Sequence, residues 1–385
     1  MREIELKDFG KPIPQVLLNI EDKNRSNLFA WRGQFSPQLI ECILNAYCLP
    51  DSVVLDPFVG SGTVLYEAAA LGLSGFGFEI NPSAWSFSKL YEFVNVPPAV
   101  RDEFISELRT RIEQEFPIII LSDNPLPIGV VEQKTINVEQ SISDGAKILF
   151  NALLVTLDIY NNEISGEFVQ SKFNSLAELV RGLPYSIRQI KADLQDARAL
   201  PMQSKSVDFV VTSPPYINVF NYHQNYRRSV EVLGWDLLRV ARSEIGSNRA
   251  NRGNRFYTVV QYCIDMANVI QEIARVLKTD GRAVLIVGHE SKVLGTPFYN
   301  ADIVEHIALQ SERFDILPRQ KRLFTNRYGE VIREDVLKLR RKSGSSVQNL
   351  AAKIGRICSA CSPYFGITKC SRKEPDTSFG GCVSY

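Results

Sequence analysis

The chain has 385 residues, of which 45% are hydrophobic, so it is long enough for one large domain with an insertion or for two domains. Its formal net charge is only +1, which excludes a polycation, so any contact with nucleic acid must come from local basic patches. No run of about 20 apolar residues occurs, which excludes a membrane-spanning helix, and the mixed, charged sequence up to Leu18 is unlike a signal peptide, so we expect a cytoplasmic protein.

The first informative stretch predicts a strand, a glycine-rich turn, a helix and a second strand. Residues 53–55 form a short apolar run typical of a buried parallel strand, and residues 63–72 predict a helix. The turn between them reads Asp-Pro-Phe-Val-Gly-Ser-Gly over residues 56–62, and its glycines allow a tight bend and a close approach to a ligand. The second strand, over residues 75–79, ends in Glu79, which is placed to accept hydrogen bonds from ribose hydroxyls.

This turn differs from the common nucleotide-binding loops. Leu65 stands where a dinucleotide fingerprint has its third glycine, and no Gly-Lys-Ser/Thr follows the turn as in a P-loop. Asp56 would repel a pyrophosphate but suits a cofactor that carries an amino group and a sulfonium. The alternative is a turn whose glycines serve only the backbone, and the sequence on either side argues against it.

A segment between residues 97 and 183 is longer than a single crossover helix requires. Its pattern predicts helices over residues 101–116, 146–159 and 168–181. We therefore expect a largely helical insertion in an α/β domain.

The second informative stretch follows a strand predicted over residues 206–211. Pro214 and Pro215 end this strand because neither residue can donate a ladder hydrogen bond. The Ser213 hydroxyl and the Pro214 carbonyl can accept the two protons of an exocyclic amine, whose lone pair is delocalised into its ring, and Tyr216 offers a face on which a base can stack. The alternative is a Pro-Pro loop with a surface tyrosine.

The remaining elements complete the alternation of strands and helices. We expect a long helix over residues 257–277, a turn over residues 278–281, a buried strand over residues 283–287, and a hairpin of strands 314–323 and 335–339 that closes the sheet. Candidates for phosphate contacts are the arginines of a polar, Gly-, Ser- and Asn-containing loop: Arg239, Arg242, Arg249, Arg252 and Arg255. A second basic cluster, over residues 313–342, could contact phosphates or could equally be the solvated surface of a hairpin.

Four cysteines near the end of the sequence are the only candidates for a metal site. Cys358 and Cys361 have ligand spacing, but Cys370 and Cys382 are too far apart for a second pair of the same kind. We expect a loosely ordered extension over residues 343–385 in preference to a zinc site.

The two stretches resemble motifs I and IV of the DNA amino-methyltransferases, which methylate cytosine N4 or adenine N6. Residues 31–37 are similar to motif X, Glu79 to the motif II acid, and Asp196 to the motif III acid, with Asp193 as the alternative. The resemblance implies a Rossmann-like α/β methyltransferase fold with a mostly parallel sheet, a C-terminal antiparallel hairpin and a helical insertion. It also implies S-adenosylmethionine as the cofactor and double-stranded DNA as the partner.

The resemblance also assigns roles to individual residues. The expected catalytic residues are Ser213, Pro214, Pro215 and Tyr216. The expected cofactor-binding residues are Phe35, Asp56, Pro57, Phe58, Gly60, Gly62, Thr63, Glu79 and Asp196. The five arginines of the polar loop are expected to bind DNA.

The implied function is site-specific methylation of DNA by direct attack of the amino nitrogen of a flipped base. Ser213 in place of Asp is typical of the cytosine-N4 enzymes, and the absence of Pro-Cys argues against a carbon-5 methylase. A restriction-modification role with a partner endonuclease is a further expectation. The alternatives are an adenine-N6 methylase, an RNA amino-methylase and a non-catalytic protein that binds the cofactor and nucleic acid.

The motif order predicts four regions. Residues 1–96 hold an N-terminal segment and the first part of the cofactor domain, residues 97–185 the insertion, residues 186–342 the catalytic remainder, and residues 343–385 the extension. Two interpretations of the insertion stay open: a target-recognition region, or a cap that only covers the cofactor cleft.

Overall fold

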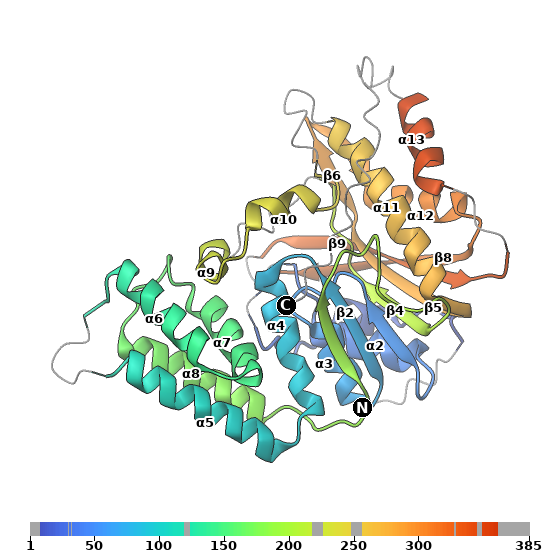
Figure 1. Cartoon of the computed structure of the whole chain (residues 1–385). Helices are drawn as coiled ribbons and strands as arrows, with labels where there is room; N and C mark the ends of the chain where they lie inside the picture. The colour runs from blue at the N-terminus through green and yellow to red at the C-terminus, as the bar shows by residue number, and fades with distance from the viewer. Residues whose placement is uncertain are drawn as a thin grey trace.

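A seven-stranded sheet forms the centre of the computed structural model, which describes residues 8–29, 31, 33–118, 124–217, 226–247, 256–326, 329–344 and 349–360 (Figure 1). The strand order is β3-β2-β1-β4-β5-β9-β8. The strands are β1 (Val53–Asp56), β2 (Ser74–Glu79), β3 (Ile190–Leu194), β4 (Val207–Thr212), β5 (Leu277–Gly288), β8 (Phe314–Thr325) and β9 (Val331–Arg341). A separate two-stranded sheet joins β6 (Glu290–Val293) to β7 (Thr296–Tyr299).

The pairing of these strands confirms the predicted fold class. Strands β1 to β5 are parallel, whereas β9 runs antiparallel to both β5 and β8. The strand order reverses between β1 and β4, where Leu55 pairs with Phe76 on one side and with Val210 on the other. Such a switch point opens a crevice at the carboxyl ends of the two strands.

Both faces of the sheet are buried, because neighbouring residues of one strand enter different apolar clusters. Val54 packs with the cluster that includes α2 (Pro37–Tyr47), α3 (Thr63–Ala70) and α4 (Pro82–Leu90). Leu55 packs with the opposite cluster, which includes α11 (Phe256–Val276) and α12 (Asn300–Gln310). This burial explains why the strands read as continuous apolar runs rather than alternating ones. The remaining short elements are α1 (Gln15–Asn19), the 3-10 helix η1 (Tyr91–Asn95), α9 (Arg227–Glu231) and α10 (Leu237–Ser243).

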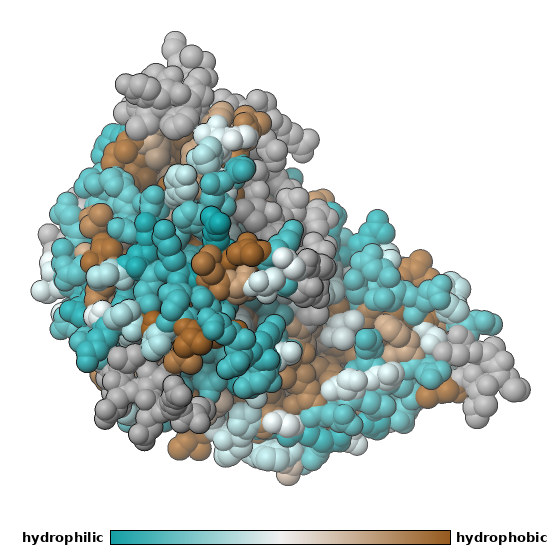
Figure 2. All heavy atoms as spheres, turned by 180° about the vertical axis from the view of Figure 1, so that it is seen from behind, coloured by the Kyte–Doolittle hydropathy of each residue, from teal (hydrophilic) through white to brown (hydrophobic). Residues whose placement is uncertain are grey.

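The insertion is a bundle of four helices: α5 (Pro98–Glu115), α6 (Ile128–Ser141), α7 (Asp144–Leu157) and α8 (Gly166–Arg181). Three of them were predicted, and α6 was missed because its buried side chains form only a narrow stripe of Val131, Thr135 and Val138. The bundle packs through α7 against α4 and α9. It projects to one side of the sheet in Figure 1 and forms the lower right lobe in Figure 2.

Arg101 holds the two ends of the insertion together. This fully buried side chain donates hydrogen bonds to the backbone carbonyls of Val96, Leu183 and Pro184, at 2.8, 2.7 and 3.0 Å. The acceptors lie before α5 and after α8, so one guanidinium joins the entry and the exit of the bundle. Its rigid fork of donors suits this position better than a lysine would.

Two local predictions are wrong. Residues 278–281 belong to β5 rather than to a turn, although the ladder is irregular there: Val207 pairs with Leu277, and Phe209 pairs with Arg282. The polar Lys-Thr-Asp-Gly sequence marks this irregularity, and a bulge carries the strand across it. The extension begins with a helix, α13 (Leu350–Ala360), which packs against α11 and α12, so residues 350–360 are not loosely ordered.

Candidate functional site

A cavity of about 1090 Å³ opens at the carboxyl ends of β1, β2, β4 and β5. Of the nine predicted cofactor-binding residues, seven line it: Phe35, Pro57, Phe58, Gly60, Thr63, Glu79 and Asp196. Three of the four predicted catalytic residues also line it: Ser213, Pro215 and Tyr216. The two stretches that are far apart in the sequence therefore meet in one cavity.

The turn after β1 requires glycine at two positions. Gly60 has a φ of 52° and Gly62 a φ of 92°, which few other residues adopt. A Cβ on Gly62 would lie 2.5 Å from the Tyr91 ring, so this residue also lets α3 begin close to η1. A Cβ on Gly60 would lie no closer than 3.8 Å to Trp31, its nearest neighbour, so the backbone at Gly60 faces open space in the cavity. Gly62 shapes the turn without lining the cavity.

Glu79 is held at the end of β2 by three backbone donors. Its carboxylate accepts hydrogen bonds from the N–H groups of Gly60, Ile80 and Asn81, at 3.1, 2.9 and 2.9 Å. Burial raises the pKa of Glu79 to about 7, against the opposite influence of these donors. The fixed carboxyl is therefore close to the balance between its charged and neutral forms at neutral pH.

Asp56 takes a different position from the one expected for a direct ligand. It is buried and does not line the cavity. Its Oδ1 accepts hydrogen bonds from the Thr212 hydroxyl at 2.6 Å and from the Phe58 N–H at 3.0 Å. Burial raises its pKa to about 7, because the two hydrogen bonds only partly offset the loss of solvation. In this structure Asp56 joins the end of β1 to the end of β4.

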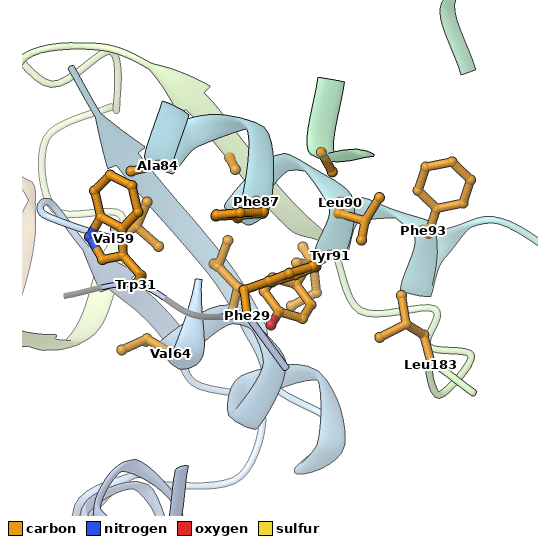
Figure 3. Close-up of a cluster of buried hydrophobic side chains, with 14 of the residues drawn as sticks. Phe29, Trp31, Val59, Val64, Ala84, Phe87, Leu90, Tyr91, Phe93 and Leu183 are labelled. Carbon is orange, nitrogen blue, oxygen red and sulfur yellow. The ribbon is translucent and has the colours of Figure 1, made fainter. Parts of the chain in front are cut away.

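Trp31, which lines the cavity, belongs to a buried aromatic cluster with Phe29 and Phe87 (Figure 3). Phe29 stacks on Phe87 with ring centroids 4.4 Å apart, and Trp31 meets Phe87 edge to face. Gln34 fixes this segment to the turn, because its Oε1 accepts a hydrogen bond from the Ser61 hydroxyl at 2.8 Å. The segment similar to motif X thus lies against the turn of motif I.

Asp196 belongs to a network that reaches across the cavity. Arg198 binds both of its carboxylate oxygens, with a shortest distance of 2.6 Å. The same guanidinium donates to Asp265 of α11 at 2.9 Å and to the carbonyl of Ser243 at 2.8 Å. Asp193, the alternative, pairs with Lys191 and does not line the cavity.

Ser213 and Tyr216 come together directly after β4. Their oxygens are 3.2 Å apart. Gly288, at the end of β5, makes room for the tyrosine, since a Cβ there would lie 2.7 Å from the Tyr216 ring. Asn300 ties these ends together by donating to the Gly288 carbonyl and accepting from the Ile217 N–H. Pro214 is buried beside this site and does not line the cavity.

Several residues that the sequence analysis did not single out also line the cavity. They are His289 and Glu290 after β5, and residues 243–247 at the end of α10 and after it. Residues 331–334, at the start of β9 and within the second basic cluster, line it as well. His289 directly follows the end of a parallel strand, where ligands bind in such sheets, and this position is the signal that could have found it. The other segments come from a loop and a hairpin, whose approach to the cavity depends on tertiary packing.

The other predicted contacts are only partly within the described chain. Arg239 and Arg242 are exposed on α10, while Arg249, Arg252 and Arg255 lie outside the described residues. Cys358 lies on α13 against the apolar cluster of α11, and Cys361, Cys370 and Cys382 fall outside the described residues. None of the helices that the structure describes has the length and apolar character needed to cross a bilayer.

The cavity suits S-adenosylmethionine. Glu79 and Asp196 offer carboxylates at the ends of neighbouring strands, where ribose hydroxyls and an adenine amino group need acceptors. Trp31, Phe35 and Phe58 add aromatic surface, and the Gly60 backbone leaves space for a close approach. When bound, this cofactor supplies a methyl group attached to a sulfonium.

Comparison with known proteins gives matches of the same kind. A family model described as DNA methylase matches residues 2–89. The chain is 33% identical over 60 residues to the Type II methyltransferase M.MjaII of Methanocaldococcus jannaschii, covering 16% of this chain and 11% of that protein. It is 22% identical over 294 residues to the Type II methyltransferase M.BsoBI of Geobacillus stearothermophilus, covering 60% of this chain and 57% of that protein. The chain thus spans less than two thirds of the length of either relative.

Solved structures show weaker likeness. An S-adenosylmethionine-dependent methyltransferase from Methanosarcina mazei is 13% identical with a TM-score of 0.37, covering 78% of this chain and 98% of that one. TrmN from Thermus thermophilus is 14% identical with a TM-score of 0.34, covering 80% and 50%. The assignment therefore rests on the family model and the curated relatives, together with motifs that meet in one cavity. These matches support assignment of the chain to the DNA amino-methyltransferases, and they support S-adenosylmethionine as the cofactor.

Proposed function

We propose that the protein transfers a methyl group from S-adenosylmethionine to the exocyclic amino group of a base in DNA. One observation carries this proposal: Ser213 and Tyr216 line the same cavity as Gly60 and Glu79. A target amine held at Ser213 would therefore share one enclosed space with the cofactor, which is what direct transfer requires.

Cytosine N4 is the proposed target atom. The Ser213 hydroxyl and the Pro214 carbonyl would accept the two amino protons and orient the nitrogen lone pair toward the methyl group. Tyr216 would stack on a base that has been flipped out of the duplex. Ser213 favours cytosine only through its resemblance to the cytosine-N4 enzymes, and adenine N6 is the second candidate because its amino group makes the same demands.

Duplex DNA is the proposed partner. Arg239 and Arg242 are exposed on α10, and the residues that follow this helix line the cavity. The two arginines would thus approach phosphates next to the flipped base. No described residue of the four-helix insertion lines the cavity, which favours target recognition over a cap as its role.

A restriction-modification system is the proposed biological setting. Both curated relatives are named Type II methyltransferases, and this supports a restriction-modification role for the present chain. A partner endonuclease is part of that proposal. Methylation of RNA and cofactor binding without catalysis are the competing functions.

The test is transfer of labelled methyl groups from S-adenosylmethionine to duplex DNA, single-stranded DNA and RNA. We expect labelling of duplex DNA and a loss of about 10- to 100-fold in rate for Ser213→Ala, since one acceptor of the amine is removed. Cofactor affinity should stay unchanged, because Ser213 is not one of the residues proposed to bind it. Labelling of RNA alone would contradict the proposed substrate, and no labelling at all by a protein that binds cofactor and DNA would favour the non-catalytic alternative.

A further inference from the structure

We propose that His289 accepts the proton that the target amine releases when it is methylated. This inference rests on the proposed function and adds a catalytic residue to it. His289 lines the cavity together with Ser213 and Tyr216. It directly follows Gly288, which lies against the Tyr216 ring.

A buried carboxylate orients the histidine. The Nδ1 atom of His289 lies 2.8 Å from the Oδ2 of Asp335, which is buried on β9. The backbone is fixed as well, because the His289 N–H donates to the Arg333 carbonyl at 3.0 Å. A carboxylate partner assigns the imidazole proton to Nδ1 and leaves the lone pair on Nε2. Nε2 has no hydrogen-bond partner among the residues that the structure describes, so it is available to a ligand in the cavity.

The charged and titratable groups around the histidine come from four strands. Arg319 of β8 lies 3.7 Å from the other oxygen of Asp335. The Tyr299 ring of β7 lies 5.6 Å from the imidazole, measured between centroids. Glu290 of β6 and Arg333 of β9 also line the cavity. The Asp335–His289 pair thus has the arrangement in which a carboxylate orients an imidazole.

The chemistry of amine methylation needs such a group. The nitrogen lone pair forms the new N–C bond while the S–CH3 bond breaks and its electron pair returns to sulfur, which becomes a thioether. The nitrogen then carries a positive charge and must lose one proton. The Ser213 hydroxyl and the Pro214 carbonyl can accept hydrogen bonds but cannot keep a proton near neutral pH, whereas an imidazole nitrogen can. In this proposal the proton moves to Nε2 of His289, directly or through one water, and from there to solvent.

Two substitutions separate catalysis from structure. In His289→Asn, the side-chain amide can still donate to Asp335 from the position of Nδ1, but it offers nothing at Nε2. In His289→Gln, the amide reaches the position of Nε2 without a basic nitrogen. We expect both variants to keep the affinities for S-adenosylmethionine and duplex DNA, and to lose roughly 100-fold or more in the single-turnover rate of methyl transfer. His289→Asn should also keep the melting temperature, whereas His289→Gln should lower it because the buried Asp335 loses its partner.

The outcomes are distinct. Transfer by His289→Asn at the rate of the unmodified protein would overturn the proposal and leave the histidine as a link between β5 and β9. Failure of the unmodified protein to methylate any base would overturn the proposed function itself.

A pH profile gives a second measurement if a variant does not fold. At saturating cofactor, the single-turnover rate of the unmodified protein should be lower in acid than at mildly alkaline pH, since only a neutral imidazole is a base. Equal rates under the two conditions would contradict a role for His289 as the proton acceptor.

Discussion

The Glu79 carboxyl is nearly balanced between its charged and neutral forms. Burial favours its neutral form, whereas the N–H groups of Gly60, Ile80 and Asn81 favour its charged form, and the resulting pKa is about 7. Ribose hydroxyls that donate to this carboxyl would favour the charged form further. Cofactor binding would then release a proton from Glu79 whenever the free protein holds one.

This balance predicts the pH dependence of cofactor binding. A carboxyl that must be ionised in the complex binds its ligand less well as the pH falls through the pKa of the free protein, which is about 7 for Glu79. We therefore expect the affinity for S-adenosylhomocysteine to fall by up to about tenfold per pH unit below pH 7. Calorimetric titrations at several pH values measure this dependence.

Glu79→Gln provides the control for this prediction. Its affinity should be lower at pH 8 and nearly constant down to pH 6, because the amide does not titrate there. Asp56 has a similar pKa, but it does not line the cavity and remains in both proteins. Equal pH dependence in the two proteins would contradict the assignment of Glu79 to the cofactor.

The roles of some site residues could be predicted from the neighbouring sequence, whereas the roles of others depend on residues far away in the sequence. The glycines at 60 and 62 were predicted because only a positive φ explains them, and Glu79 because an acid at a strand end has a specific use. The role of Asp56 could not be predicted, since its turn toward Thr212 depends on pairing between β1 and β4, 156 residues apart in sequence. His289 was missed because its partner Asp335 lies on a different strand.

The position of residues 243–247, at the end of α10, depends on the side chain of Arg198, which is distant in the sequence. Arg198 joins Asp196 to the Ser243 carbonyl and to Asp265, and the other oxygen of Asp265 accepts a hydrogen bond from the Gly246 N–H at 2.9 Å. Residues 243–247 are thereby held over the same cavity as Asp196. We infer that Arg198 positions Asp196 for the adenine amino group while it fixes this segment.

Substitution of Arg198 tests this dependence. Arg198→Lys cannot keep the fork of contacts to two carboxylates and a carbonyl. We expect a loss in the preference for S-adenosylhomocysteine over S-inosylhomocysteine, which lacks the amino group, from about 10-fold or more to about 3-fold or less, because a hydrogen bond to a charged acceptor is worth about 1.5–3 kcal/mol. Competitive binding measures both affinities.

Arg275→Lys is the matched control for Arg198→Lys. Arg275 also bonds a carboxylate and two carbonyls, those of Glu272, Leu200 and Met202, but none of these partners lines the cavity, whereas Asp196 and Ser243 do. Its substitution should leave the preference for the adenosyl ligand unchanged. If Arg198→Lys keeps the full preference, then Arg198 does not position Asp196 for the adenine.

Helices and strands were predicted best where their apolar residues recur with a clear period. The long helix α11 and the buried strands carry strong apolar patterns, and their predicted ends lie within a few residues of the observed ones. Helix α6 buries too few side chains to give such a pattern. The ladder through residues 278–281 could not be predicted, because only pairing with β4 and β9 makes this polar stretch part of a strand.

At the scale of the whole molecule, two parts of the chain converge on one cavity while the insertion stays to one side. Strands β1 and β2 contribute the turn and Glu79, and strands β4 and β5, much later in the sequence, contribute Ser213 and His289. The bundle of α5 to α8 packs against α4 and α9 instead. This separation suits a division between a methyl-transfer site and a surface that selects the target.

The central claim concerns the product, so the most direct measurement is mass spectrometry of bases from the DNA of a methylation-free host that expresses the chain. We predict N4-methylcytosine in host DNA and a lower level of it when the host expresses Ser213→Ala in the same amount. N6-methyladenine would replace the proposed target base and leave the mechanism in place. Host DNA without any methylated base, from cells in which the chain is folded and binds S-adenosylmethionine, would contradict the account.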